Sequence, residues 1–299
     1  KIDQLYKYDF NSLNIGKVWT RSTRYIFKMH TGWPLGHKAG TVMAMAAMGQ
    51  PKYFDEFYEI LSNKNILKKA MRYCKGDQKR GIFDPEKDNP HPVYNKWRIL
   101  AQENEQEKFN IAASLQKATE LKIKEIITKA FKLDECKGIK NLCMSGGVVL
   151  NSVATGKVYD WFADKIEKIY IPPAPNDAGL TIGSAQYVWH HILENPRITW
   201  QDNCTPYLGK KYDANQIQDA IKKFSNIKVE KVNDEHVLDL LTQESVISVF
   251  GGGSESGKRA LGNRSIIADP RSKTMKDTVN FKVKHREWYR PFAPSILKE

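Results

Sequence analysis

The chain has 299 residues, 41% of them hydrophobic and 11% aromatic, and it carries a formal net charge of +13 at pH 7. These values fit a globular protein large enough for two domains. The sequence has no run of about 18 apolar residues and no visible signal peptide, so we expect a cytoplasmic protein without a membrane span. The basic charge suits nucleic acid or small polyanions such as nucleotides as partners, whereas four cysteines without a Cys-x-x-Cys pair argue against a zinc site or a disulfide scaffold.

Small residues dominate the first recognisable helix. Residues 36–49 have Gly at both ends and Ala and Met between them, which predicts a helix that packs closely against another backbone. His37 lies at its start, and a lone histidine without a spaced partner is more often structural than a ligand. Residues 76–92 are rich in Asp, Lys, Pro and Gly and predict a loop or an irregular insertion.

The middle of the chain alternates between helices and short strands. Apolar residues recur at helical spacing over residues 104–133. Strands are predicted at 138–143 and 168–171, and helices follow them at about 151–165 and 177–191. This order of strand, glycine turn, helix, strand, turn and helix predicts an α/β fold with parallel strands.

A domain boundary is predicted between residues 194 and 209, where the sequence has two prolines and few apolar side chains. The predicted domains are therefore residues 1–200 and 206–299. The elements predicted beyond the boundary are a helix at 214–224 and strands near 227–232 and 246–250.

Two turns follow the predicted strands of the first domain at their carboxyl ends, where open α/β sheets bind ligands. In the first turn, Gly146 and Gly147 remove side chains so that a nucleotide or sugar can lie against the backbone, while Asn151 fits a helix N-cap. In the second turn, Asp177 lies at a helix N-terminus, as an N-cap or as a metal carboxylate directed into the same crevice. Spacing alone favours the structural interpretation of both turns.

The most informative segment, residues 251–265, follows the predicted strand at 246–250. Its glycines let backbone N–H groups approach an anion, and Arg259 and Arg264 add positive charge. The spacing also matches a P-loop, but Arg259 stands where Ser or Thr should bind magnesium, and Glu255 would put a carboxylate into the phosphate cradle. We predict an anion site other than a P-loop; a structural hairpin with exposed basic residues is the alternative.

A second basic segment, residues 284–294, places three cations and three aromatic rings together. The rings offer faces for an adenine or for cation–π contacts, and Arg286 and Arg290 have the fork geometry that clamps a phosphate. An aromatic, basic surface loop and a platform for single-stranded nucleic acid are the alternatives. Its closeness in sequence to residues 251–264 favours one shared anion site.

Four segments together resemble the NodU/CmcH/TobZ-type O-carbamoyltransferase family, in the order in which the family has them. Residues 36–49 resemble its small-residue Met-Ala-Gly segment, 145–151 its Gly-Gly-Val-x-Leu-Asn loop, and 172–183 its Pro-Pro-x-Pro-x-Asp-Ala-Gly turn. The longest match begins with 255–271, which is similar to the family's Arg-Ala-Leu-Gly-Asn-Arg-Ser-Ile and Ala-Asp-Pro-Arg stretches. It continues over 290–294 with Arg-Pro-Phe-Ala-Pro.

The resemblance implies a two-domain α/β enzyme, with an actin-like ATPase-fold (ASKHA) portion followed by the start of a YrdC-like domain. In the family, the YrdC-like domain makes carbamoyl-adenylate from carbamoyl phosphate and ATP. The other domain then moves the carbamoyl group to a hydroxyl of a small-molecule acceptor, with an iron-type metal at its site. Lys258 departs from the family's usual Pro, and the family's N-terminal phosphate loop and two metal-binding histidines are not found. We therefore expect a fragment, with parts of both domains outside this sequence.

Carried over residue by residue, the resemblance implies three groups of site residues. Asp177 becomes a ligand for a divalent metal, Fe²⁺ or, together with ATP, Mg²⁺. Gly146, Gly147 and Asn151 become contacts for the nucleotide or the intermediate. The third group consists of positively charged side chains, as expected because phosphoryl and adenylyl chemistry depends more on charge neutralisation and positioning than on a protein nucleophile. This group, the contacts for carbamoyl phosphate and the adenylate, consists of Arg259, Arg264, Arg286 and Arg290.

The sequence does not identify the acceptor, although the basic charge favours an anionic one such as a hydroxymethyl-pyrimidine nucleotide. A tRNA threonylcarbamoyl-adenosine synthase-like enzyme is an alternative that fits the charge, and a non-catalytic nucleic-acid-binding module that uses residues 286–290 is another. The Arg-Ala-Leu-Gly-Asn-Arg-Ser stretch favours the small-molecule family. Because scattered lysines are typical of solvated helix faces, a stable nucleic-acid partner is not expected, and a homodimer stays open.

Overall fold

The computed structural model describes residues 3–29, 38–74, 90–197 and 206–297. The chain divides into two compact units, Lys1–Ile171 and Pro172–Glu299. Each mixes helices with a small sheet, compatible with the α/β prediction. The actin-like and YrdC-like assignments, and the domain boundary between 200 and 206, stay predictions.

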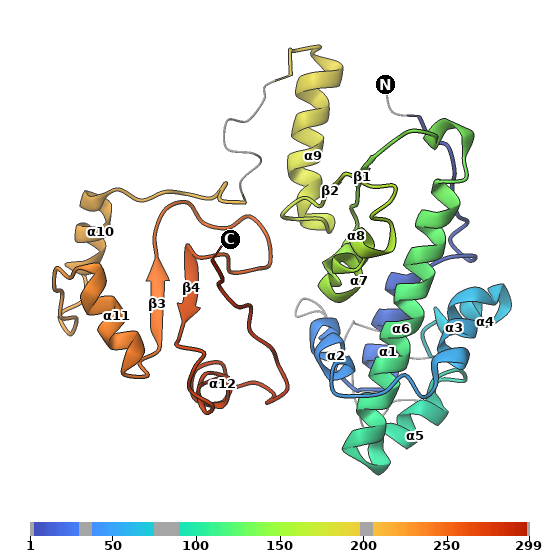
Figure 1. The fold of residues 1–299 in the computed structure, drawn as a ribbon, viewed down its shortest axis with the longest axis horizontal. Coiled ribbons are helices and arrows are strands. Elements are labelled where there is room, and N and C mark those ends of the chain that lie inside the picture. The colour runs from blue at the N-terminus through green and yellow to red at the C-terminus, as the bar shows by residue number, and fades with distance from the viewer. Residues whose placement is uncertain (1–2, 30–37, 75–89, 198–205, 298–299) are drawn as a thin grey trace. The chain divides into compact units, whose positions relative to one another are not determined.

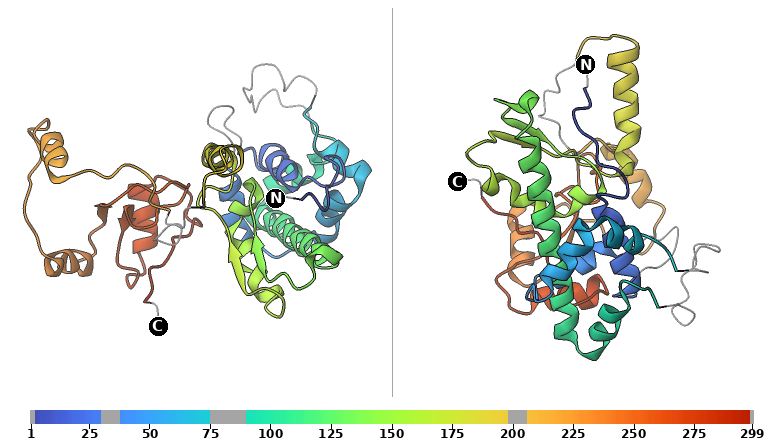
Figure 2. Two further views of the ribbon diagram at one scale, coloured as in Figure 1. Left: turned by 90° about the horizontal axis from the view of Figure 1, so that it is seen from above. Right: turned by 90° about the vertical axis from the view of Figure 1, so that its right-hand side faces the viewer.

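Unit 1 is built around the long helix α6, Glu105–Ala130 (Figure 1 and Figure 2). Three helices pack against it, namely α2 (Ala39–Ala46), α3 (Phe54–Ser62) and α5 (Asn95–Glu103). Two more helices of this unit, α1 (Ile15–Tyr25) and α4 (Lys64–Ala70), also precede α6 in the chain. The fully buried apolar side chains of this core include Val18, Val42, Met45, Phe57, Leu61, Leu67, Ile111 and Leu115.

The sequence explains why α6 forms. Asn104 is its N-cap, and the Asn104 side-chain oxygen accepts a hydrogen bond from the Glu107 backbone N–H at 2.7 Å. Acidic residues in the first turn and Lys129 in the last turn complement the helix dipole. The helix predicted at 104–133 is therefore confirmed.

A two-stranded parallel sheet follows α6, again as predicted. Strand β1 (Asn141–Cys143) pairs with β2 (Lys168–Tyr170), and Leu142 lies opposite Ile169. The single helix predicted at 151–165 is instead divided at Lys157 into α7 and α8. The short elements around the sheet are η1 (Asp134–Cys136), η2 (Gly147–Leu150), α7 (Ser152–Gly156) and α8 (Val158–Trp161).

Unit 2 contains a two-stranded antiparallel sheet in which β3 (Ile247–Phe250) pairs with β4 (Arg264–Ile267). Strand β3 matches the prediction, whereas β4 was not predicted. The strand predicted near 227–232 is wrong: these residues alternate apolar and charged side chains, but no described strand pairs with them. Without a partner, their backbone groups cannot form a ladder.

The remaining elements of unit 2 are helical. The predicted helix at 177–191 is observed as η3 (Asp177–Gly179), α9 (Leu180–Tyr187) and η4 (Val188–Ile192), and the one at 214–224 as α10 (Ala214–Ile221). Asn233 caps an additional helix, α11 (Asp234–Thr242), by accepting the His236 backbone N–H. The last two helical segments are α12 (Met275–Thr278) and η5 (Val279–Val283). No helix in the described part of the chain could cross a membrane.

The Gly-flanked helix predicted at 36–49 is observed as α2, although His37 and most of residues 76–92 lie outside the described residues. After α2, the chain crosses α6 very closely at Gly49. A Cβ atom at this position would overlap the carbonyl carbon and oxygen of Phe109. The close packing against another backbone that the small residues predict is therefore found here.

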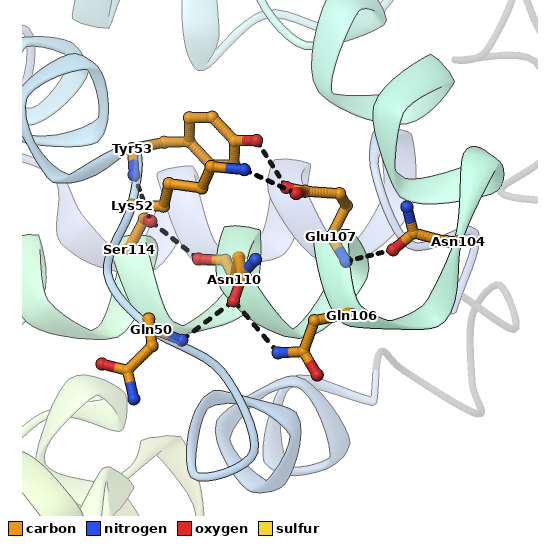
Figure 3. Close-up of polar contacts among 8 residues, drawn as sticks. All are labelled: Gln50, Lys52, Tyr53, Asn104, Gln106, Glu107, Asn110 and Ser114. Carbon is orange, nitrogen blue, oxygen red and sulfur yellow. Dashed lines mark hydrogen bonds and ion pairs between the residues drawn. The ribbon is translucent and has the colours of Figure 1, made fainter.

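Hydrogen bonds fix the segment that follows Gly49 to the same helix (Figure 3). The backbone N–H of Gln50 donates to Asn110 Oδ1 at 3.0 Å, and the backbone N–H of Tyr53 donates to Ser114 Oγ at 2.9 Å. Both Lys52, at 2.7 Å, and the Tyr53 hydroxyl also bind the carboxylate of Glu107. These hydrogen bonds, from Lys52 first, hold the pKa of Glu107 below its ordinary value.

Replacement of Gly49 by Ala should therefore destabilise unit 1 by about 1–3 kcal/mol, because the crossing cannot widen without moving two backbones. Thermal or denaturant unfolding of the purified protein measures this effect. Gly40→Ala is the matched control: Gly40 is exposed in α2, and a Cβ there meets no described atom within 4 Å. It should stabilise the protein by about 0.5–1 kcal/mol. Equal effects of the two variants would contradict the packing argument.

Candidate functional site

The turn after β1 contains the first predicted contact residues, Gly146 and Gly147. Gly146 has a φ of +101°, which residues with side chains rarely adopt. A Cβ at Gly146 would meet no described atom within 4 Å, so the backbone conformation, rather than crowding, requires glycine. Among the described residues, the space beside Gly146 is open, which is compatible with a ligand lying against its backbone.

Asn151 closes the same turn and caps α7. Its Oδ1 accepts the backbone N–H of Ala154 at 3.1 Å, so the capping interpretation is confirmed. The Asn151 amide also exchanges two hydrogen bonds with Gln116 of α6: Nδ2 donates to Gln116 Oε1 at 2.8 Å, and Oδ1 accepts from Gln116 Nε2 at 3.2 Å. A direct nucleotide contact by Asn151 stays a prediction, and only one amide hydrogen is left for it.

Gln116 also binds Glu120, a buried carboxylate in an ion pair with the half-exposed Lys157, which the sequence did not reveal. Its Nε2 donates to Glu120 Oε1 at 3.0 Å, and Glu120 Oε2 accepts from Lys157 Nζ at 2.8 Å. Glu120 is only 4% exposed. The sequence signal that could have revealed this contact is the spacing of Gln116 and Glu120. Polar residues four positions apart lie on the same side of a helix, and when that side is buried they need hydrogen-bond partners.

Asp177 lies at the start of η3 in unit 2 and is exposed. The preceding residue, Asn176, is in the N-cap position, and neither side chain caps the helix. Among the described residues, the Asp177 side chain has no hydrogen-bond or ion-pair partner, and no three His, Cys, Asp or Glu side chains gather as a metal site would require. The turn itself is tight, since a Cβ at Gly179 would overlap the carbonyl oxygen of Ala174.

The glycine-rich loop after β3 wraps around the carboxylate of Glu255. One oxygen, Oε1, accepts the backbone N–H groups of Leu261 and Asn263 at 2.9 Å each and of Arg264 at 3.2 Å. These hydrogen bonds, led by that of Leu261, lower the pKa of Glu255 to about 2. The anion that these N–H groups hold in this structure is therefore the loop's own carboxylate.

The guanidinium of Arg264 holds the other side of the loop. Its NH1 donates to the carbonyls of Gly251 and Asn263 at 2.6 and 2.7 Å, and its Cζ atom lies 3.7 Å from the centre of the Phe250 ring. Arg264 therefore fixes the path of the glycine turn. Arg259, by contrast, is exposed on the same loop.

The second basic segment is organised by Asn280, whose side chain is fully buried. Its Nδ2 donates to the carbonyls of Trp288 and Arg290 at 3.2 and 3.1 Å, and its Oδ1 accepts from Arg286 Nε at 2.7 Å. Burial lowers the pKa of Arg286, and the charge of neighbouring Arg290 lowers it further. Asn280 lies outside the motif that drew attention to this segment, so sequence reasoning missed it.

Two of the predicted segments touch. A Cβ at Gly257 would overlap the carbonyl oxygen of Pro173, so the glycine-rich loop lies directly on the turn that carries Asp177. The metal-ligand candidate and the loop with Arg259 and Arg264 are thus neighbours within unit 2.

Family comparisons agree with this arrangement of motifs. A family model described as the N-terminus of carbamoyltransferases matches residues 2–186, and one described as the C-terminus of carbamoyltransferases matches residues 238–299. The chain belongs to the carbamoyltransferase family. The resemblance found in its motifs is thereby confirmed, while the YrdC-like assignment is not tested by these matches.

Relatives of this carbamoyltransferase chain include nodulation proteins. It is 33% identical over 266 residues to Nodulation protein NolNO of Sinorhizobium fredii, covering 86% of this chain and 36% of that protein. It is 34% identical over 268 residues to Nodulation protein NolO of Bradyrhizobium diazoefficiens, covering 86% and 45%. An uncharacterized protein of Synechocystis is 34% identical over 286 residues, covering 91% and 45%. The chain thus spans less than half the length of these relatives.

The carboxylate of Glu255 makes the stability of this carbamoyltransferase chain depend on pH. Its folded-state pKa lies below the ordinary value, so its contribution is complete above about pH 5 and is lost as the pH falls toward 2. Glu255→Gln should therefore lower the melting temperature most at neutral pH, and the difference from wild type should shrink toward pH 2–3.

Melting curves of both proteins between pH 2.5 and 7 test this expectation. Glu230→Gln is the control, because Glu230 is an exposed residue of the same unit that pairs with Lys228 at the surface. A Glu255→Gln difference that does not change with pH would contradict the role given to the carboxylate.

Proposed function

We propose that the full-length protein is an O-carbamoyltransferase that forms carbamoyl-adenylate from carbamoyl phosphate and ATP and transfers the carbamoyl group to a hydroxyl of a small-molecule acceptor. Membership of the carbamoyltransferase family supports the transfer reaction. The observation that carries the finer proposal is the contact of Gly257 with Pro173, which brings the arginine-bearing loop onto the Asp177 turn.

The proposed chemistry has two parts. Hydrolysis of carbamoyl phosphate supplies carbamate and phosphate, and a carbamate oxygen then attacks the α-phosphorus of ATP and expels pyrophosphate. The acceptor hydroxyl next attacks the carbamoyl carbon, loses its proton and expels AMP. Both parts move negative charge, so the protein's task is positioning and charge neutralisation. Arg259, Arg264, Arg286 and Arg290 are the proposed contacts to the phosphates.

These arginines differ in how they could act. Arg264 and Arg286 are already bound to backbone carbonyls or to Asn280, so they present rigid positive charge. Arg259 is exposed and is the best placed to reach a ligand. Gly146 and Gly147 are the proposed contacts for the adenylate in unit 1, where the open space beside the turn supports this role.

We also propose that Asp177 supplies one ligand to a divalent metal, Fe²⁺ in preference to Mg²⁺. The described residues alone do not make a metal site, because no group of three His, Cys, Asp or Glu side chains forms among them. No step above is routed through the metal.

A phosphorylated acceptor, such as a hydroxymethyl-pyrimidine nucleotide, is proposed because of the net charge of +13. The same charge also suits a tRNA substrate, as in a threonylcarbamoyl-adenosine synthase-like enzyme. Transfer of the carbamoyl group to a free nucleotide but not to tRNA would separate the two proposals.

Pyrophosphate release by the full-length protein tests the first reaction. Release in the absence of an acceptor should require ATP and carbamoyl phosphate together. Arg259→Ala should lower the rate about tenfold or more, as expected when a charged contact to a phosphate is lost. Lys258→Ala removes the neighbouring exposed cation and should change the rate little. Release that is independent of carbamoyl phosphate, or equal losses in the two variants, would contradict the proposal.

Asp177→Asn should reduce the iron that the purified full-length protein retains to less than half, because an amide is a poorer ligand than a carboxylate. Metal analysis after anaerobic reconstitution measures this. Asp219→Asn, at an exposed residue of the same unit that pairs with Lys222, is the control. Unchanged iron content in Asp177→Asn would remove Asp177 from the ligand set.

A further inference from the structure

A chain of polar side chains connects the interior of unit 1 to the Gly146–Gly147 turn. It begins at Lys157, passes through the carboxylate of Glu120 and the amide of Gln116, and ends at Asn151. Glu120 and Gln116 are buried, whereas the Lys157 side chain is 45% exposed. None of the roles proposed above uses Lys157, Glu120 or Gln116.

The charge of Glu120 sets the direction of every hydrogen bond in this chain. A carboxylate only accepts, so the NH₂ group of Gln116 must face Glu120 and its Oε1 must face Asn151. Oε1 in turn accepts from Asn151 Nδ2, which leaves Asn151 Oδ1 to accept the backbone N–H of Ala154. A neutral group in place of Glu120 could face Gln116 with either a donor or an acceptor, and the fixed directions of these hydrogen bonds would be lost.

Asn151 transmits this order to the turn. Its backbone N–H donates to the carbonyl of Val148 at 3.0 Å, and Val149 donates to the carbonyl of Gly146 at 3.0 Å. The other end of the turn is held to the sheet, since the Met144 N–H donates to the carbonyl of Tyr170 at 2.9 Å. The turn is thus fixed at the sheet on one side and by the buried polar chain on the other.

We infer that Glu120 is a positioning residue that, through Gln116 and Asn151, fixes the Gly146–Gly147 turn in the conformation that binds the adenine nucleotide. The inference rests on the proposed function, which places the nucleotide at this turn. It assigns Asn151 a supporting role: its side chain orients the turn, and the backbone of the two glycines contacts the nucleotide.

Binding of AMP, the leaving group of the transfer step, tests this inference in the full-length protein. Glu120→Gln keeps the shape but removes the charge, and it should weaken AMP binding about tenfold, as expected when a buried polar group loses its partner. Pyrophosphate release, whose proposed phosphate contacts all lie in unit 2, should stay within about twofold of wild type. Glu167→Gln is the control, because Glu167 forms an exposed ion pair with Lys140 in the same unit and should leave both values unchanged.

A merely structural role gives a different result: the melting temperature falls, but the AMP affinity of the folded protein equals that of wild type. That result overturns the inference. If Glu120→Gln does not fold, Lys157→Met replaces it, because Lys157 is half-exposed and its loss also leaves Glu120 without its counter-ion. AMP binding by Lys157→Met equal to wild type would also overturn the inference.

Failure of the proposed function looks different again. In one outcome, wild type binds AMP and Glu120→Gln weakens this binding, but wild type releases no pyrophosphate from ATP and carbamoyl phosphate. The adenylation chemistry is then wrong, and the positioning role stands. If wild type releases pyrophosphate but does not bind AMP, the positioning role is wrong and the adenylation chemistry stands.

Discussion

Helix α6 buries several polar side chains, and each of them must find a hydrogen-bond partner inside unit 1. This constraint determines what packs around the helix. Asn110 and Ser114 bind backbone N–H groups of the segment after Gly49, Thr119 accepts the indole N–H of Trp19 at 2.8 Å, and Gln116 binds Asn151. One helix therefore sets the position of α1, of the segment after α2 and of the glycine turn. An apolar α6 would give the same burial but would not specify which segment lies at which height along the helix.

Unit 2 uses a different principle, since close backbone contacts do much of what side chains do in unit 1. Gly257 lies on Pro173, and Gly179 lies on Ala174. Backbone hydrogen bonds from Ser256 to Pro206 and from Gly209 to Ser254, at 2.8 and 2.9 Å, hold the glycine-rich loop in place. Because the contacts at Gly253 and Gly257 leave no room for a Cβ, packing requires glycine at these two positions of the loop.

These two principles explain which features the sequence could predict. The repeating apolar positions of α6 and the β-branched run of β3 are local patterns, and both elements were predicted from them. The pairing of β4 with β3 and the failure of residues 227–232 to form a strand depend on partners elsewhere in the chain, which local pattern does not contain. The candidate site shows the same limit: its glycines and arginines are motif residues, whereas Glu120 and Asn280 act only through contacts that folding creates.

The glycine-rich loop could bind an anion through its backbone N–H groups or through its arginine side chains, and the structure favours the arginines. In a P-loop, backbone N–H groups cradle the phosphate. Here the N–H groups of Leu261, Asn263 and Arg264 are occupied by Glu255, whose low pKa keeps it charged at neutral pH. A second anion at the same N–H groups would have to displace a carboxylate that is held by three hydrogen bonds. In the proposed function guanidinium groups meet the phosphates, and the role of Glu255 is to keep the loop folded so that Arg259 can meet them.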